Sequence, residues 1–528
     1  MNLRREIAQL VVVRASGYSC DSQRRYPRWE LTNQELENCL SEGVGGVILL
    51  GGSTADLALR CRQLQQWAGT KAENQLLLCA DVEEGVGQRF EGATWLVPPL
   101  ALAPLWQDQP HRAEALAKAY GQCTGREAQI LGLNWVLGPV CDVNNNPANP
   151  VINVRAWGET VEAATALSKA FLQGLEEQGV LGCAKHFPGH GDTSQDSHLQ
   201  LPCLNHSVER LENLELLPFK AAIKANVASV MTAHLQLPAL DPNLPATLSG
   251  KVLTGLLRQQ LGFDGLIVTD ALVMEAITSH YGAGEAAALA FDAGADLILM
   301  PADFHAALTA IEQGFKQNRW PRERLEQSLK RRRLALARCA VLKTDATAAL
   351  AAMANCALNH GALAQELLQV SLQQQGCKPN QQTKSGLNLI RVDNSLACSA
   401  LPPAAPALLR PQAAGLQTIL IDGSSQPLNL ERLPAGGVLL QLFVRGNPFR
   451  GTADADGYWA KLVQNLVKQQ RLKGLVVYGS PYLWQELKDL IPAHIAAVYS
   501  PGQMPAAQVL ALESLGFCGA PHEGGFTN

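Results

Sequence analysis

Long apolar runs are absent from this sequence of 528 residues. A membrane-spanning helix needs roughly 20 consecutive apolar residues, and the run Val11-Val12-Val13 near the N-terminus is interrupted by Arg14. We therefore expect neither a signal peptide nor a transmembrane segment. A strong excess of one charge is also absent, because Lys and Arg number 43 and Asp and Glu number 47. Without a basic cluster, we expect no nucleic acid or membrane partner.

The cysteines lack the paired spacing of a metal or redox motif. There are 13, an odd number, and none stands in a CxxC arrangement. Cys79, Cys141 and Cys183 lie in apolar runs, so buried free thiols in a reducing cytoplasm fit better than disulfides or zinc. With 47% apolar and 17% charged residues the chain is globular, and its length predicts more than one domain.

Short apolar runs alternate with amphipathic stretches over residues 1–340, where we expect the first domain. Eight strands are predicted, at Gln9–Val13, Gly46–Leu50, Leu76–Ala80, Leu133–Val140, Val180–Ala184, Ala228–Ala233, Gly265–Thr269 and Ala295–Met300. This alternation predicts an α/β fold, a (β/α)8 barrel of the TIM type. A doubly wound open sheet is the alternative, although neither GxGxxG nor a P-loop follows the first strand.

The rest of the chain is predicted to form a helical linker and a second domain. Residues 341–385 are alanine-rich and then polar, and we assign them to the linker. Residues 386–528 again alternate apolar runs with helical stretches, and we expect a smaller α/β sandwich domain there. The segment Ala397–Pro411 is rich in Pro and Ala, and we interpret it as irregular. Without a dense polar cluster, this domain is expected to be structural.

Polar residues follow successive predicted strands of the barrel. They are Asp81, Asp142, the pair Lys185 and His186, His234 and Asp270. Because the carboxyl ends of parallel strands meet on one face of a barrel, we expect these side chains to converge there. This convergence favours an enzyme.

The stretch from Lys185 to His198 concentrates histidines and aspartates after the fifth strand. Gly189 and Gly191 permit a tight, exposed loop. Three interpretations are open for it: a solvated loop, a metal site, or acid/base catalysis by Asp196 and His198 with Lys185 and His186 holding a substrate. A metal-dependent hydrolase would use His186, His190, Asp192 and His198.

The residues supply what a retaining sugar hydrolase requires, a nucleophilic carboxylate and an acid/base group. Asp270 stands at a strand end and fits the nucleophile, although an N-cap of the next helix is its alternative role. The His198 imidazole titrates near neutral pH and suits the acid/base role. Asp196, two residues earlier, can orient that ring and support its positive form.

The motif Lys-His-Phe-Pro-Gly-His-Gly at 185–191, followed after four residues by Asp196 and His198, resembles the signature of β-N-acetylglucosaminidases of glycoside hydrolase family 3. Three further segments are similar to this family in the same order. They are Asp81–Phe90, with Asp81 and Arg89 eight apart, Asn149–Gly158, which contains Arg155, and Thr269–Met274, which contains Asp270.

The resemblance implies a role for each matched residue. Asp270 would be the nucleophile, and His198 with Asp196 the acid/base dyad. The sugar hydroxyls and N-acetyl group would be bound by Asp81, Arg89, Arg155, Lys185 and His186. No metal or organic cofactor is implied. The substrates would be peptidoglycan fragments ending in β-linked N-acetylglucosamine, hydrolysed in the cytoplasm during cell-wall recycling.

The chain also departs from the family pattern. Glu84-Gly85-Val86 stands where the family usually has Gly-Gly-Arg, and Ala271 stands where many relatives have an acidic residue. One alternative is a β-N-acetylglucosaminide phosphorylase, since a histidine acid/base does not repel phosphate. The others are a β-glucosidase of the same family and a non-catalytic sugar-binding protein.

Overall fold

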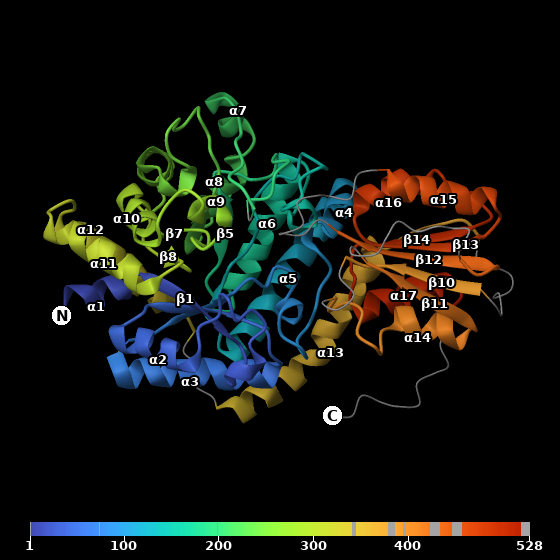
Figure 1. Cartoon of the computed structure of the whole chain (residues 1–528), viewed down its shortest axis with the longest axis horizontal. Coiled ribbons are helices and arrows are strands. Elements are labelled where there is room, and N and C mark those ends of the chain that lie inside the picture. Colours follow the sequence, from blue (N-terminus) through green and yellow to red (C-terminus); the bar gives the residue numbers. More distant parts are fainter. Residues whose placement is uncertain are drawn as a thin grey trace. The chain divides into compact units, whose positions relative to one another are not determined.

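The computed structural model describes residues 2–72, 74–197, 199–340, 345–377, 386–393, 398–422, 433–445 and 457–518 (Figure 1). They form two compact units, the first extending to Ala364 and the second beginning at Gln365. Within these ranges, no helix combines the length and apolar character needed to cross a bilayer. Cys79, Cys141 and Cys183 are buried free thiols, as predicted.

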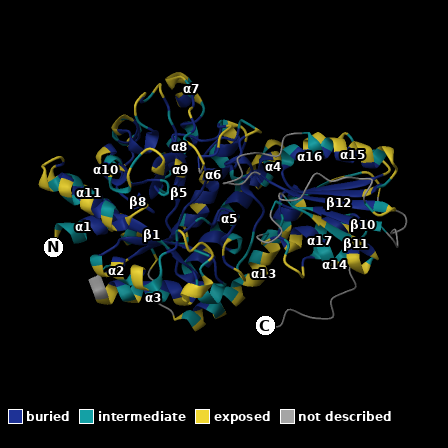
Figure 2. Ribbon diagram, viewed as in Figure 1, coloured by how far each residue is buried: buried dark blue, intermediate teal, exposed yellow. Residues whose placement is uncertain are grey.

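Eight short parallel strands form the centre of the first unit, and all eight match predicted apolar runs. Their residues are almost entirely buried (Figure 2). The strands are β1 (Val11–Ser16), β2 (Gly46–Leu50), β3 (Leu77–Ala80), β4 (Trp135–Val136), β5 (Cys183–Phe187), β6 (Ser229–Thr232), β7 (Leu266–Val268) and β8 (Ile298–Leu299).

Hydrogen bonds divide these strands into a five-stranded sheet in the order β4-β3-β2-β1-β8 and a three-stranded sheet β5-β6-β7. Isolated parallel bridges, Trp135 to Leu181 and Val268 to Leu297, join the two sheets at both seams. The predicted barrel is therefore confirmed, although its ladder is not strictly closed. The doubly wound alternative is wrong, because it requires the strand order to reverse, whereas here neighbours follow chain order.

Helices surround the strands of the first unit and expose their outer faces (Figure 2). Thr32 and Glu35 start α2 with a capping box, which supplies partners for backbone N–H groups of the first turn. The helices of eight or more residues are α2 (Asn33–Glu42), α3 (Thr54–Ala72), α5 (Pro110–Leu131), α6 (Val161–Glu176), α8 (Leu217–Lys224), α10 (Ala283–Ala293), α11 (Phe304–Lys316) and α12 (Arg322–Arg338), together with a π-helix at Lys251–Gln260.

The second unit is built on a six-stranded sheet in the order β11-β10-β12-β13-β14-β9. Five strands are parallel, and the edge strand β9 (Gln373–Gln375) pairs antiparallel with β14. The parallel strands are β10 (Gly386–Arg391), β11 (Leu416–Ile421), β12 (Gly437–Val444), β13 (Leu472–Gly479) and β14 (Ala496–Ser500). Their apolar side chains form a separate core that includes Leu389, Leu440 and Val477.

Helices cover both faces of this second sheet (Figure 1). On one face lie α15 (Tyr458–Lys468) and α16 (Pro481–Lys488), and on the other α14 (Pro406–Ala413) and α17 (Pro505–Ser514). The expectation of an irregular segment at Ala397–Pro411 is therefore wrong for α14. Pro406 occupies the first turn of that helix, where a missing N–H has no cost.

Candidate active site

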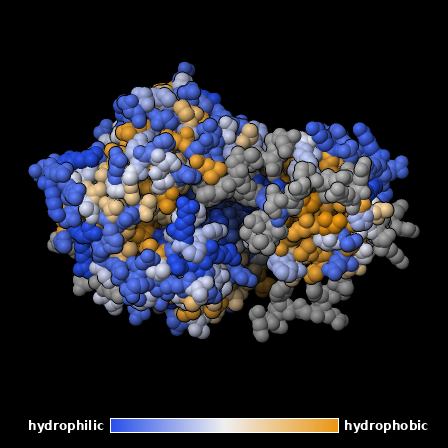
Figure 3. All heavy atoms as spheres, viewed as in Figure 1, coloured by the Kyte–Doolittle hydropathy of each residue, from blue (hydrophilic) through white to orange (hydrophobic). Residues whose placement is uncertain are grey.

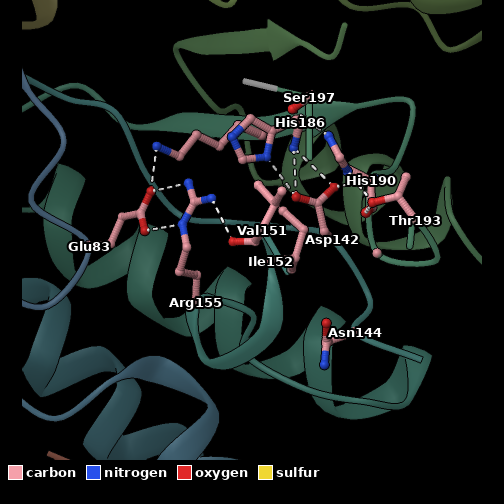
Figure 4. Close-up of polar contacts among 12 residues, drawn as sticks. Glu83, Asp142, Asn144, Val151, Ile152, Arg155, His186, His190, Thr193 and Ser197 are labelled. Atoms are coloured by element: carbon pink, nitrogen blue, oxygen red, sulfur yellow. Dashed lines mark hydrogen bonds and ion pairs between the residues drawn. The ribbon is translucent and has the colours of Figure 1, made fainter. Parts of the chain in front are cut away.

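Lys185 is the centre of a buried charged network at the carboxyl ends of the barrel strands. Its Nζ lies 2.7 Å from Asp81 Oδ1 and 2.6 Å from Glu83 Oε1. Glu83 also forms two bonds with Arg155, at 2.7 Å from Nε to Oε2 and 2.8 Å from Nη2 to Oε1 (Figure 4). Three segments distant in the sequence therefore meet through alternating charges.

Glu83 and Lys185 are both ionised at neutral pH. Burial alone would raise the pKa of Glu83, but the positive charges of Arg155 and Lys185 hold it well below its ordinary value. Burial would likewise lower the pKa of Lys185, and the carboxylates of Asp81 and Glu83 raise it above its ordinary value instead. Fixed charges of both signs suit a ligand rich in hydroxyl groups.

Arg89 and Arg155 each have a backbone contact that holds the side chain. Arg89 donates from Nε to the carbonyl oxygen of Asp81 at 3.0 Å and is otherwise exposed. Arg155 donates from Nη1 to the carbonyl oxygen of Val151 at 3.0 Å. Four of the five predicted sugar-binding residues, Asp81, Arg89, Arg155 and Lys185, are thus brought together.

The fifth, His186, belongs to a second cluster around Asp142 (Figure 4). The buried Asp142 carboxylate accepts the backbone N–H of His186 at 3.1 Å and that of His190 at 2.7 Å. Its Oδ2 also lies 2.7 Å from His186 Nδ1. Although burial acts in the opposite sense, His186 and His190 lower the pKa of Asp142. The carboxylate therefore holds the proton of His186 on Nδ1.

His190 stabilises the loop that carries the predicted dyad. Its Nε2 lies 2.9 Å from Ser197 Oγ and its Nδ1 lies 3.0 Å from Thr193 Oγ1. Burial lowers the pKa of His190 to about 4, so the ring is neutral at pH 7. One ring nitrogen then donates a hydrogen bond and the other accepts one. Asp196 adjoins Ser197 and is buried, whereas His198 lies outside the described residues.

The loop after β5, which begins at Pro188 and is called the motif loop here, is packed against the chain after Asp142. The expectation of an exposed loop is wrong for most of its described residues. A Cβ at Gly191 would lie 1.7 Å from the carbonyl oxygen of Val143, so only glycine fits. Asn149 Nδ2 donates to the carbonyl oxygens of His190 and Gly191 at 2.9 and 2.8 Å. These contacts bury the loop against the segment that contains Arg155.

Lys185 and His186 lie within β5. The sequence had led us to expect that they would follow the strand, and this expectation is wrong. The strand begins three residues later than predicted, because Val180 to Gly182 lie at the seam beside β4. The apolar run and the hydrogen-bonded strand therefore have different bounds, although both end beside the residues of the candidate site.

Asp270 follows β7 and is partly exposed. Its Oδ1 accepts the backbone N–H of Ala271 at 2.7 Å. The N-cap alternative is wrong, because the next helix, α9 (Glu275–Thr278), has Met274 as its N-cap. The buried His234 lies with Nε2 3.1 Å from the carbonyl oxygen of Ala271, which ties the end of β6 to this segment.

Two described donors of the metal-site alternative, His190 and Asp192, have other partners and do not fit a shared ion. Both ring nitrogens of His190 bond to hydroxyl groups of its own loop. Asp192 Oδ2 lies 2.6 Å from Arg210 Nη2, and that guanidinium also reaches Glu215. Because the carboxylate of Asp192 forms an ion pair with Arg210, we assign it a structural role.

Two family models cover most of the chain. Residues 2–334 match the glycosyl hydrolase family 3 N-terminal domain. Residues 379–516 match the bacterial glycosyl hydrolase family 3 C-terminal domain. The chain belongs to glycosyl hydrolase family 3.

Relatives within this family of glycosidases are about one third identical to the chain over the residues that align. Beta-hexosaminidase A of Pseudoalteromonas piscicida is 35% identical over 348 residues, which are 61% of this chain and 56% of the relative. The beta-hexosaminidase of Thiobacillus denitrificans is 34% identical over 51% of this chain and 75% of its own length. The chain thus spans little more than half the length of the first of these relatives.

A solved family 3 structure resembles almost the whole chain. The family 3 beta-N-acetylglucosaminidase from Paenibacillus sp. str. FPU-7 superposes with a TM-score of 0.78 and 28% identity. The similarity covers 98% of this chain and 97% of that protein. Both units of the chain therefore have counterparts in one family 3 enzyme.

Three residues of the site were not among those predicted, namely Glu83, Asp142 and Asn149. Glu83 stands two residues after Asp81 in an acidic segment, but its partners Lys185 and Arg155 are distant in sequence. Asp142 was noted as a strand-end residue without a role. Asn149 opens the Arg155 segment, and only the folded loop reveals its contacts with Gly191.

Proposed function

We propose that the chain is a retaining β-N-acetylhexosaminidase that releases terminal β-linked N-acetylglucosamine. The observation that carries the proposal is the single charged network of Asp81, Glu83, Arg155 and Lys185 beside the motif loop. It supports a sugar site, because fixed donors and acceptors can hold a polyol in one orientation. The β-hexosaminidases among the relatives support the N-acetylated sugar.

In the proposed mechanism, Asp270 attacks the anomeric carbon and His198 gives its proton to the departing oxygen. A glycosyl-enzyme ester results. Water then gives a proton to His198 and attacks the same carbon, which releases Asp270 and retains the anomeric configuration. Asp196 orients the imidazole and supports its charged form.

We assign substrate binding to Asp81, Arg89, Arg155, Lys185 and His186. The proposed physiological substrates are peptidoglycan fragments that end in β-linked N-acetylglucosamine, and the proposed site of action is the cytoplasm. Catalysis is assigned to the barrel of residues 1–340. For the domain expected at residues 386–528 we propose a structural role.

Initial rates on an aryl β-N-acetylglucosaminide and an aryl β-glucoside, each with and without phosphate, test this proposal. We expect the N-acetylated substrate to be preferred and phosphate to leave the rate and the product unchanged. Formation of a sugar 1-phosphate would establish a phosphorylase instead, and preference for the glucoside would establish a β-glucosidase. Absence of turnover on both substrates would favour a sugar-binding protein.

A further inference from the structure

Helices α5 and α13 (Ala346–Ser371) bring together three side chains that can bind a metal ion. Cys123 and Glu127 are four residues apart on α5, and His360 lies on α13. Cys123 Sγ, a carboxylate oxygen of Glu127 and a ring nitrogen of His360 all lie within 4.8 Å of one another. All three belong to the first unit, and none takes part in the proposed sugar site.

The three donors are sheltered from solvent. Cys123 is 3% exposed and Glu127 is 2% exposed. The side chain of His360 is 14% exposed and its Nδ1 lies 2.8 Å from Glu127 Oε1. Ligands of a tetrahedral zinc ion are separated by roughly 3.5 Å. The ion would therefore be admitted if the proton between His360 and Glu127 were displaced and these two side chains moved slightly apart.

The carboxylate of Glu127 is held in place by a neighbouring loop. Thr94 Oγ1 donates to Glu127 Oε1 at 2.6 Å, and the backbone N–H of Thr94 donates to Oε2 at 3.0 Å. Metal-binding carboxylates commonly have such oriented partners, which fix the ligand before the ion arrives.

A second thiol lies on the same helix as His360. Cys356 precedes His360 by four residues, and residues at this spacing share one face of a helix. Thiolate, imidazole and carboxylate donors together match the ligands of Zn²⁺.

We propose that Cys123, Glu127 and His360 bind one zinc ion that fastens α13 to α5. Binding releases the thiol proton of Cys123, and the neutral ring of His360 binds through Nδ1 with its proton on Nε2. Helix α13 is exposed along much of its length, and Leu358 is 87% exposed. A metal cross-link would therefore hold a helix that is exposed along much of its length.

Cobalt absorption of the full chain tests the site directly. The protein is freed of metal with a chelator and titrated with Co²⁺, whose bond to a thiolate gives a near-ultraviolet charge-transfer band. We expect the band to saturate at one ion per chain, to vanish in Cys123→Ser and to persist in the matched control Cys61→Ser, which alters a buried thiol of α3. An ion bound only by histidines and aspartates of the motif loop would give no thiolate band. Absence of the band, or its persistence in Cys123→Ser, would overturn the proposal.

Zinc affinity and melting temperature supply a second test with a substitution on an exposed helix. We expect Zn²⁺ to raise the melting temperature of the native chain by mass action, and His360→Ala to weaken zinc binding on the order of tenfold or more. If His360→Ala lowers the melting temperature equally with and without Zn²⁺ and leaves zinc affinity unchanged, His360 and Glu127 form an ion pair only. Neither test depends on glycosidase activity, so its result is distinct from that of the proposed function.

Discussion

Glu83 and Arg155 lie 72 positions apart in the chain and form a two-bond ion pair with N–O distances of 2.7 and 2.8 Å. Both oxygens of Glu83 are used, and Oε1 is shared with Lys185. Glu83 therefore orients two of the proposed sugar-binding cations, Arg155 and Lys185. No motif had identified this acidic residue.

Glu83→Gln should destabilise the protein and weaken substrate binding. The substitution keeps the shape of the side chain but leaves Arg155 and Lys185 with one anionic partner fewer in a buried place. We expect the free energy of unfolding to fall by about 3 kcal/mol and KM for the aryl β-N-acetylglucosaminide to rise. Denaturant unfolding and initial rates measure both. The exposed neighbour Glu91→Gln is the control, and equal effects of the two variants would contradict the assigned role.

Asp142→Asn should slow turnover although Asp142 need not touch the substrate. One oxygen of the carboxylate becomes an NH₂ group, so the side chain can no longer accept all of the hydrogen bonds that His186 and His190 now donate to its two oxygens. Displacement of these residues should lower kcat/KM by about 10²-fold. Steady-state kinetics of this variant and of the exposed control Asp264→Asn would reveal the difference. Unchanged kinetics with a lowered melting temperature would show that Asp142 only stabilises the fold.

Stability should fall between pH 6.5 and 4 because of His190. Burial lowers its pKa from 6.5 to about 4, so in this range the unfolded chain binds a proton that the folded chain does not. The stabilisation is complete above pH 6.5 and decreases as the pH falls, by about 3 kcal/mol in total. The lowered pKa values of Glu83 and Asp142 act in the same sense at more acidic pH.

Urea unfolding at several pH values compares the native chain with His190→Asn. We expect the variant to lose part of the slope between pH 6.5 and 4.5. His206, whose pKa is also lowered by burial, is present in both proteins and does not affect the difference. Parallel curves would mean that His190 takes up its proton equally in the folded and unfolded states.

Asp196→Ala should reduce kcat by a factor on the order of 10²–10⁴, because the acid/base imidazole loses its orienting carboxylate. The pH profile of kcat should also shift, since Asp196 supports the positive form of His198. A variant in which kcat and its pH profile both match the native values would remove Asp196 from the dyad.

The sequence predicted a strand well where the ends of an apolar run coincide with the ends of the hydrogen-bonded strand. The apolar run of β2 at Gly46–Leu50 was predicted with its observed bounds. The predicted fourth strand, Leu133–Val140, was too long. Pro139 lacks an N–H for the ladder, so β4 is confined to Trp135–Val136.

The sequence predicted residues of the site within each matched segment, but not the contacts that join one segment to another. The motif at 185–191 is local, whereas the partners that orient it are not. Asn149 reaches Gly191 and Glu83 reaches Arg155 only after the barrel has aligned its strand ends. For the same reason, spacing in the sequence gave no indication that Cys123 lies near His360.

Trapping of the glycosyl-enzyme tests the central proposal most directly. A fluorinated N-acetylglucosaminyl donor that forms the intermediate quickly and hydrolyses slowly should inactivate the enzyme. Mass spectrometry of the digested protein should then find one N-acetylglucosaminyl group on Asp270, and Asp270→Ala should bind the sugar without being labelled. A label on another carboxylate, or turnover by Asp270→Ala at the native rate, would contradict the account.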